Sequence, residues 1–512
     1  MNHEAVVLDG QSLTIQDLID ITRSGKSVVL SEEGKKRIQK ARSIIEEKLA
    51  NNEVIYGVST GFGKLADEVI SPEEREILQK NLIKSHSIGF GSYIPDEIVL
   101  GAMVIEVNSF CRGGSGIRLA VVEMLVSLIN NRVIPLVPSI GSLGASGDLS
   151  PLAYIARILI GDGEAKFGDK LIKVSEILAK LDLSPLELSA KEGLSLINGT
   201  HVLTSYAAHT VFDGLNVIKN SVISVGLTLE AFDGNIEAFS SFIMNLRPHK
   251  GQMEFAKALL KVLENSDLTK NKPKRIQDPY SIRCSPQVHG AVLDAVIHCK
   301  KLVDIEINST TDNPLIDIDN SVVASGGNFH GEPIGLAMDY LSIAMTELGN
   351  ISERRVNLLL DASISGLSPF LSDHPGLNSG LMILQYADTA ISAENKVLAS
   401  PASIDNTSVS ANQEDHVSMG LTASKKAYKI ISNVAKMIAV EIYTACQALN
   451  FNETRTISTG LDKIYSYVRK TIPPLKEDRF FDTEVYWIEK QINNRKLIQL
   501  VESETGKLLG EL

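Results

Sequence analysis

The sequence predicts a mostly α-helical protein built around a bundle of long helices, and three observations carry this prediction. First, three long stretches contain very few charged residues, and a helix that is apolar on nearly all sides has to be buried on nearly all sides. Second, β structure is limited to short hairpins. Third, no internal repeat, low-complexity tract or linker divides the 512 residues into independent parts. The three stretches are residues 221–232, 333–360 and 434–449.

Short hairpins are predicted at three places. Two apolar runs within residues 6–15 flank the turn residues Asp9-Gly10, which indicates an N-terminal hairpin. Further hairpins are centred on Gly168-Asp169 and on Asp319-Asn320, each between apolar runs. These strands are too short to form a large sheet, so the fold class remains mostly α.

Helix starts are predicted from capping residues. Ser31 precedes two glutamates, which places negative charge at the positive end of a helix that extends towards residue 50. Residues 71–74 read Ser-Pro-Glu-Glu, a capping box with proline in the first turn. Asp148 or Ser150 precedes the apolar run 152–160, which predicts a third helix start.

Composition excludes several classes of partner. The chain has 50 basic and 62 acidic residues and a net charge of −12, which argues against nucleic acid or an anionic membrane as the main partner. No stretch offers the roughly 18 uninterrupted apolar residues of a membrane span. The N-terminus has no basic region followed by an apolar one, so we expect no signal peptide and a cytoplasmic protein.

Cysteine and histidine usage gives no sign of a disulfide framework or a metal site. The ten histidines are dispersed, without HExxH or His/Cys pairs at ligand spacing, so we expect no metal. The four cysteines form no CxxC pair, which suits a reducing compartment. They are Cys111, Cys284, Cys299 and Cys446.

The most unusual stretch is GSLGASGDLSPL, residues 141–152, in which small residues surround Ser146. With so little side-chain bulk, the backbone can fold sharply on itself. The Gly147 nitrogen can then attack the Ala145 carbonyl carbon, and loss of two waters gives a five-membered imidazolone ring with Ser146 reduced to a methylidene group. That ring is an electrophile, which the twenty side chains do not supply. The plainer interpretation is a small-residue loop before a helix.

Other polar stretches decide between these interpretations. Taken together with ASGD, they resemble the histidine and aromatic amino acid ammonia-lyases, whose serine forms the methylidene-imidazolone (MIO) cofactor. The resemblance extends from about residue 56 to about residue 481, and the motifs occur in the family's order. The polar stretches are Tyr56–Lys64, Ser85-His86, Asn198-Gly199-Thr200, QDPYSIRCSPQ from Gln277, SGGNFHGEP from Ser325 and ANQEDHVSM from Ala411.

The resemblance implies a fold and an assembly. The fold is the aspartase/fumarase-like superfold, with a long central helix bundle and minor β hairpins. The subunits share helices in a homotetramer, and the active sites are shared between subunits. We expect one ammonia-lyase domain over residues 1–512, with an N-terminal region (1–110), a segment with the MIO and the central bundle (111–450) and C-terminal helices (451–512).

The resemblance also implies site residues. Ala145, Ser146 and Gly147 would form the MIO without any external cofactor, and Tyr56 matches the proposed general base. Arg283 suits a carboxylate, which it can hold with two parallel hydrogen bonds. A tyrosine base requires a lowered pKa, since its ordinary value is near 10. The remaining matches are Tyr280 and Glu414 as catalytic residues, and Gly63, His86, Asn198, Gln277 and Phe329 as substrate-binding residues.

Ser85-His86 matches the pattern of the family's histidine-specific members, and the QEDHVSM stretch with Glu414 resembles the same branch, so the resemblance implies L-histidine as the substrate, converted to trans-urocanate and ammonia. An imidazole needs hydrogen-bond partners at both edges, and a buried Glu and His would leave those bonds unmade beside a phenyl ring. Whether the amine or the ring adds to the MIO stays open. The alternatives are a phenylalanine or tyrosine ammonia-lyase, or an aminomutase. An aspartase-type lyase would need a GSSxMPxKxN loop, which is absent, and a non-catalytic scaffold has no need of ASG, Tyr56 or Arg283.

Overall fold

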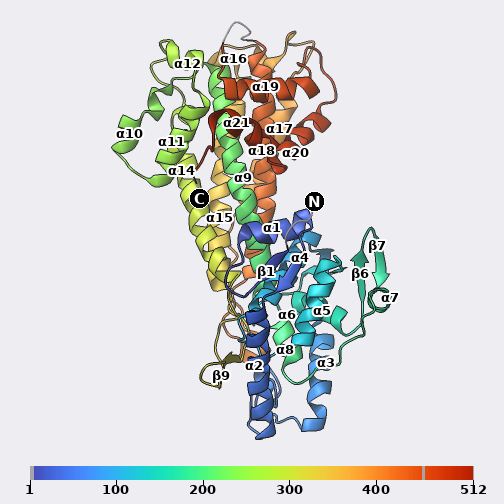
Figure 1. Cartoon of the computed structure of the whole chain (residues 1–512). Helices are drawn as coiled ribbons and strands as arrows, with labels where there is room; N and C mark the ends of the chain where they lie inside the picture. Colours follow the sequence, from blue (N-terminus) through green and yellow to red (C-terminus); the bar gives the residue numbers. More distant parts are fainter. Residues whose placement is uncertain (1–4, 452–455, 511–512) are drawn as a thin grey trace. The chain divides into compact units, whose positions relative to one another are not determined.

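The computed structural model describes residues 5–451 and 456–510, which fall into two compact units (Figure 1). The first unit comprises residues 1–209, 300–339 and 401–425, and the second comprises residues 210–299, 340–400 and 426–512. Four of the five divisions fall within the ranges of long helices, α9 (His201–Phe232), α14 (Ser285–Glu306), α15 (Glu332–Leu360) and α18 (Gly420–Leu449), and the fifth falls between residues 400 and 401, outside these helices. The mostly α fold class is confirmed. The single domain over residues 1–512 stays a prediction.

The remaining helices are shorter and belong to one unit each. The first unit contains α1 (Ile15–Ser24), α2 (Glu32–Ala50), α3 (Arg75–His86), α4 (Asp96–Cys111), α5 (Leu119–Asn130), α6 (Leu149–Leu159), α7 (Val174–Lys180) and α8 (Glu192–Ile197). The second contains α10 (Ser241–Asn245), α11 (Lys250–Val262), α12 (Asp267–Lys270), α13 (Tyr280–Arg283), α16 (Ala362–Ser365), α17 (Met382–Leu398), α19 (Thr459–Thr471), α20 (Asp482–Asn493) and α21 (Lys496–Thr505). Short 3-10 helices are η1 (Gly63–Leu65), η2 (Pro72–Glu74), η3 (Ile236–Phe239), η4 (Pro369–Leu371) and η5 (Ser410–Asn412).

The strands are short and pair within the first unit. The hairpins predicted at Gly168-Asp169 and Asp319-Asn320 are confirmed as β6–β7 and β8–β9, both antiparallel. The antiparallel sheets contain β3 (Phe90–Tyr93) with β5 (Pro138–Ile140), β4 (Ile134–Pro135) with β6 (Glu164–Phe167) and β7 (Lys170–Lys173), and β8 (Leu315–Asp317) with β9 (Val322–Ala324).

The predicted N-terminal hairpin is wrong. Strand β1 (Val6–Leu8) pairs in parallel with β2 (Val28–Leu30), and helix α1 lies between them in sequence. The reason is a capping box: the Thr14 side chain accepts the Asp17 N–H, and the Asp17 carboxylate accepts the Thr14 N–H. This box starts a helix at the second apolar run, so that run cannot pair with the first.

The three helices predicted from capping residues are present and begin close to the predicted positions. The Ser31 hydroxyl accepts the Gly34 N–H at 2.9 Å and caps α2 as expected. The capping box predicted at residues 71–74 is wrong: the Ser71 hydroxyl donates to the Glu74 carboxylate and accepts no backbone N–H, so these residues form the 3-10 turn η2 and α3 follows at Arg75. Helix α6 begins at Leu149, but the carboxylate of Asp148 does not cap it.

The second unit is organised around a buried polar cluster that joins four helices. The Glu441 carboxylate of α18 accepts bonds from hydroxyls of α9 and α15 and two bonds from Arg355 of α15. Nη2 of Arg355 also lies 3.4 Å from His289 Nε2 on α14. Neither Arg355 nor Glu441 has any solvent-exposed side-chain surface. The bundle predicted from the apolar helices is therefore present within this unit.

Burial follows the predictions for two of the three apolar stretches. Residues 221–232 are buried throughout, and within 434–449 only Lys436 is partly exposed. In the stretch 333–360, Leu336, Tyr340 and Ile343 are 47–52% exposed. Among the described residues, no helix is both long and apolar enough to cross a bilayer.

Candidate active site

The loop at residues 141–148 lies in the first unit and makes a tight turn across Ala145 and Ser146. Gly144 and Gly147 form an antiparallel bridge, and the Gly147 N–H donates to the Gly144 carbonyl at 3.2 Å. Ser146 has φ 51°, a left-handed conformation that is uncommon for a residue with a side chain. The turn thus brings the Gly147 nitrogen back towards the residues before Ser146, as ring closure onto Ala145 would require.

A second backbone segment packs directly against this turn. The Gly199 N–H donates to the Ser146 carbonyl at 3.3 Å, and the Asp148 N–H donates to the Gly199 carbonyl at 2.7 Å. A Cβ atom on Gly147 would overlap the Gly199 carbonyl oxygen. Only glycine fits at position 147, so the sequence requirement follows from the contact itself.

The segment 411–419 covers the turn from another side. A Cβ atom on Gly144 would overlap the Ser418 hydroxyl, so these backbones are in close contact. The Ser146 hydroxyl faces the Glu414 carboxylate at 3.5 Å, which is longer than the roughly 2.5–3.0 Å of an ordinary O–H···O bond, so the two groups are neighbours with only a weak bond between them. The structure therefore brings together Ser146 and Glu414, 268 positions apart, as the predicted site requires.

Tyr56 lies in the glycine-rich loop of residues 54–67. Its hydroxyl accepts the Gly63 N–H at 2.9 Å, so both predicted residues of this loop contact each other. A Cβ atom on Gly63 would lie 3.0 Å from the Ser410 hydroxyl, which places η1 against η5. The loop with Tyr56 and the segment that leads to Glu414 are thus neighbours.

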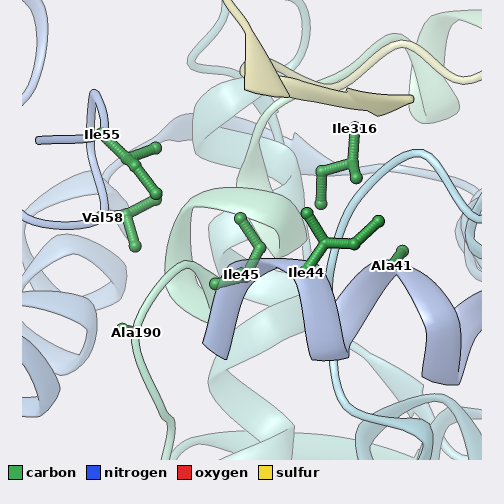
Figure 2. Close-up of a cluster of buried hydrophobic side chains, with 7 residues drawn as sticks. All are labelled: Ala41, Ile44, Ile45, Ile55, Val58, Ala190 and Ile316. Carbon is green, nitrogen blue, oxygen red and sulfur yellow. The ribbon is translucent and has the colours of Figure 1, made fainter. Parts of the chain in front are cut away.

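A cluster of buried hydrophobic side chains fixes the backbone of the Tyr56 loop. Figure 2 shows Ile55 and Val58, which flank Tyr56, on the loop side of this cluster. Both side chains are at most 6% exposed, whereas Tyr56 between them is partly exposed. The backbone of the loop is therefore fixed while the phenol stays accessible. The other members are Ala41, Ile44 and Ile45 of α2, Ala190, and Ile316 of β8.

Asn198 is held in place by a buried network. Its amide donates to the Asn313 carbonyl at 3.1 Å and to the Asp312 carboxylate at 3.5 Å. The Lys191 ammonium donates to the same Asp312 carboxylate at 2.7 Å and to the Ser195 hydroxyl at 3.0 Å. Lys191 and Asp312 are 0% and 3% exposed, so this ion pair is enclosed in protein. It fixes the segment that contacts the Ser146 turn.

Several buried ionisable groups lie near this network. Burial raises the pKa of Asp148 to about 7, although its carboxylate accepts the N–H groups of residues 202 and 203 in the first turn of α9. Burial also raises the pKa of Glu106 and of Glu306, the second despite a bond from Thr200. Burial lowers the pKa of His201 to about 4. Burial shifts the pKa of each of these groups in the direction that disfavours its charged form.

His86 and Phe329 are both half-buried in the first unit. His86 is the last residue of α3, and its Nδ1 lies 2.9 Å from the Leu82 carbonyl and 3.0 Å from the Ser85 hydroxyl. Because a carbonyl oxygen only accepts, Nδ1 carries the hydrogen and Nε2 of the neutral ring is an acceptor. Phe329 lies in the loop that precedes α15.

Gln277, Tyr280 and Arg283 belong to the second unit and form a separate group. The Arg283 guanidinium lies 4.6 Å from the centre of the Tyr280 ring, and its Nε atom is buried and has no hydrogen-bond partner within residues 5–451 and 456–510. Tyr280 is 71% exposed, and Gln277 is also exposed. The group therefore presents an aromatic ring, an amide and a guanidinium at the surface of this unit.

Three residues around the Ser146 turn were not predicted in the roles that the structure gives them. Lys191 and Asp312 are 121 positions apart, and neither lies in a polar motif that suggested a pair. Asp148 was predicted only as a cap for its own helix, yet it binds the start of α9. Its position directly after the Ala-Ser-Gly triad was the one available signal.

Comparisons with known proteins identify relatives of this chain over nearly its full length. The family model described as "Aromatic amino acid lyase" matches residues 13–470. A histidine ammonia-lyase of Caldanaerobacter subterraneus subsp. tengcongensis is 47% identical over 475 residues, 93% of this chain and 94% of the relative. The crystal structure of histidine ammonia-lyase from Trypanosoma cruzi has a TM-score of 0.92 at 36% identity and covers 99% of this chain and 97% of its own. A tyrosine aminomutase from Streptomyces globisporus has a TM-score of 0.92 at 32% identity and covers 98% of this chain and 99% of its own.

Proposed function

We propose, on the premise that this chain belongs to the aromatic amino acid lyase family, that it deaminates L-histidine to trans-urocanate and ammonia, the first step of histidine degradation. Such a reaction makes it a carbon–nitrogen lyase. The contact between Ser146 and Glu414 carries the proposal, because it places an acid suited to an imidazole ring beside the serine of the Ala-Ser-Gly triad. The two histidine ammonia-lyases named above are 47% and 36% identical to this chain and the tyrosine aminomutase is 32% identical, so a phenylalanine or tyrosine substrate and an aminomutase reaction are not favoured.

We propose further that Ala145, Ser146 and Gly147 cyclise to the MIO. The tight turn, the left-handed Ser146 and the contact of Gly147 with Gly199 support this, since each favours attack of the Gly147 nitrogen on the Ala145 carbonyl. The MIO would supply an electrophilic carbon that activates the substrate. The first turn of α6 follows directly, and its free N–H groups favour negative charge nearby.

The residues around the turn take distinct roles in this proposal. Tyr56 removes the β-proton of the substrate, and its bond from the Gly63 N–H stabilises the phenolate. Asn198 orients groups at the turn through its fixed amide. Arg283 holds the substrate carboxylate, and this role is supported by its Nε atom, which has no hydrogen-bond partner among the described residues. Tyr280, which stacks under Arg283, assists catalysis.

Specificity is proposed to depend on His86 and Glu414. Nε2 of His86 and the carboxylate of Glu414 are both hydrogen-bond acceptors, so they suit an imidazole ring that carries protons on both nitrogens. A phenyl ring would leave both acceptors unpaired. Gly63 and Phe329 of the first unit, and Gln277 of the second, are each proposed to bind substrate.

We also propose a homotetramer with active sites shared between subunits, located in the cytoplasm. Exposed apolar side chains on long helices support the assembly, because burying them against another subunit removes apolar surface from water. The four free cysteines suit a reducing compartment. Sedimentation velocity would give the mass of one, two or four chains and so test the assembly directly. The exposed side chains are Leu336, Tyr340 and Ile343 of α15 and Ile383, Tyr386 and Val397 of α17.

Intact mass spectrometry tests the cofactor. The wild-type chain is expected to weigh less than its sequence by two waters, and the Ser146→Ala chain to show its full sequence mass and no turnover. Ser24→Ala, the same change at an exposed serine outside this loop, is the matched control and is expected to cyclise. An active wild-type chain with the uncyclised mass would contradict the proposed cofactor.

Substrate preference tests the proposed reaction. With ammonia release followed on each amino acid, histidine is expected to exceed phenylalanine and tyrosine by about 10⁴-fold in kcat/KM, as for sites built around ligand hydrogen bonds. Glu414→Ala should lose most activity on histidine while its mass still shows the loss of two waters. Faster deamination of phenylalanine or tyrosine would contradict the histidine assignment.

A further inference from the structure

Three potential metal ligands meet in the first unit, outside the residues assigned above. His330, Glu332 and His416 each offer one ligand atom, and these atoms all lie within 4.8 Å of one another. His330 and Glu332 stand at the start of α15, and His416 lies in the loop before α18. The two histidines are 86 positions apart, so no local spacing in the sequence reveals the group.

The two imidazole rings face each other and are only weakly engaged. Their planes are 6° from parallel, and their centres are 5.6 Å apart. Nε2 of His330 donates to the His416 carbonyl at 3.4 Å, and its Nδ1 accepts the Glu332 N–H at 3.3 Å. Both distances are longer than those of ordinary hydrogen bonds. Forming a metal–nitrogen bond would therefore replace only a weak hydrogen bond.

The carboxylate beside these rings is incompletely satisfied. Glu332 is partly exposed, but its Oε2 atom is buried from solvent and accepts no hydrogen bond from any described residue. A buried carboxylate oxygen without a partner is costly and calls for an explanation. The first turn of α15 favours negative charge in general but supplies no donor to this oxygen. A cation between the carboxylate and the two rings would satisfy it.

The backbone that carries the three ligands is closely packed. A Cβ atom on Gly331 would lie 3.1 Å from the Ser418 hydroxyl, and one on Gly420 would lie 3.3 Å from the Gly331 carbonyl oxygen. Ser418 itself is fully buried. The segments around residues 330 and 416 are therefore fixed against each other, which a metal site with defined geometry requires.

We propose that His330, Glu332 and His416 bind one divalent transition-metal ion, with Zn²⁺ as the best match. Two imidazoles and one carboxylate suit zinc and disfavour Ca²⁺ or Mg²⁺, which prefer oxygen ligands. Zinc bonds of about 2.0–2.1 Å in a tetrahedron place ligand atoms roughly 3.3 Å apart, so modest side-chain rotation closes the group around the ion. Water takes the fourth position.

The ion would link two segments that carry proposed substrate-site residues. Phe329 directly precedes His330, and Glu414 lies two positions before His416. Metal binding would thereby hold Phe329 and Glu414 in a fixed relation. The binding site itself depends only on the geometry of the three ligands, whereas an effect on turnover rests on the proposed function.

Calorimetric titration with ZnCl₂ tests the site. The chain should carry no affinity tag, be treated with EDTA and dialysed, and be free of histidine, which itself binds zinc. One ion per chain is expected, and Co²⁺ in its place should give visible absorption bands of a tetrahedral site. Glu332→Gln and His416→Ala should each weaken binding by at least about 100-fold, more than is typical for outer partners of a metal. His374→Ala, which removes an exposed histidine, should bind as the wild type does.

The outcomes separate this proposal from the proposed function. Absence of saturable zinc binding, or equal affinity in wild type and both ligand variants, overturns the metal site. Circular dichroism establishes that each variant is folded. If His416→Ala does not fold, the near-isosteric Glu332→Gln still measures the effect of losing one ligand on zinc binding. A chain that binds zinc as expected but does not deaminate histidine would retain the metal site and lose only the proposed function.

Discussion

The buried carboxylates of Glu441 and Asp148 represent two ways of placing polar groups inside this protein. Glu441, in the bundle of the second unit, accepts five hydrogen bonds, two of them from Arg355. Asp148, beside the Ser146 turn in the first unit, accepts two backbone bonds through one oxygen, and its other oxygen has no partner. Both side chains are fully buried.

The difference distinguishes a buried carboxylate that stabilises the fold from a buried carboxylate beside the candidate active site. A fully partnered charge is compatible with a rigid core, although its net contribution to stability is small because desolvation offsets the attraction. A carboxyl group with too few partners favours its neutral form, so it retains a proton near neutral pH. The bundle therefore provides a rigid frame, and the environment of the turn provides groups whose protonation can change.

The largest expected effect is on turnover and comes from Tyr56→Phe. The change removes the phenol oxygen while the ring keeps its packing, so turnover is expected to fall by about 10²–10⁴-fold. Loss of the Gly63 bond should lower the free energy of unfolding by only about 1 kcal/mol. Steady-state kinetics, denaturant unfolding and intact mass measure the three properties, and the cyclised mass should persist.

Tyr93→Phe, at an exposed tyrosine of β3, is the matched control for this substitution. It removes the same atom from a surface position and should leave turnover unchanged. Near-normal turnover of Tyr56→Phe would remove Tyr56 from the role of base.

The next effect is on stability and comes from Glu441→Gln in the bundle. The side chain keeps its shape, but Arg355 loses its opposite charge in a fully buried site. Breaking one partner of such a pair costs about 3–5 kcal/mol of unfolding free energy. The midpoint of urea unfolding followed by circular dichroism measures the loss. Glu33→Gln, at a glutamate with 67% side-chain exposure, should change it by less than about 0.5 kcal/mol. A Glu441→Gln chain as stable as the wild type would contradict the structural role.

The smallest effect is a change with pH and comes from Asp148→Asn. Burial raises the pKa of Asp148 in the folded chain to about 7, from an ordinary value of 3.8. The folded state therefore binds more protons than the unfolded state between these values, and the stability of the wild type falls as pH rises through this window. The Asn variant cannot titrate at this position. Its stability relative to the wild type should rise with pH by at most about 1.4 kcal/mol per pH unit.

Thermal unfolding of both chains from pH 5 to pH 8 measures this change. Asp319→Asn, at an exposed carboxyl group, should follow the wild type throughout. A constant difference between Asp148→Asn and the wild type across the range would mean that Asp148 stays ionised in the folded chain.

Local features of the structure were predictable, and contacts between distant segments were not. Ser31 caps α2 because its partner lies three residues away, and the hairpin at Gly168-Asp169 needs only its own turn. The parallel pairing of β1 with β2 requires helix α1 to connect the two strands along the chain. The pattern of residues 6–15 did not indicate this helix. Sequence periodicity describes which faces are buried but not which segments meet.

The candidate site divides in the same way. The Ala-Ser-Gly triad, Tyr56 with Gly63, and Glu414 were recognisable because each lies in a distinctive motif. Lys191 was not recognisable, since a lone lysine usually lies at the surface. Its burial follows from its pairing with Asp312 and Ser195, and that pairing exists only in the folded chain.

The contact of Gly199 with the turn also determines when the proposed cyclisation can take place. The turn at Gly147 is supported by bonds to and from Gly199, which is 52 positions later in the chain. While the chain is being synthesised, the triad is present before Gly199 and the start of α9 have emerged. The electrophile would therefore arise only after the surrounding segments have assembled. A nascent or misfolded chain would remain chemically inert, and the fraction of chains with the lower mass would measure how much of a preparation has matured.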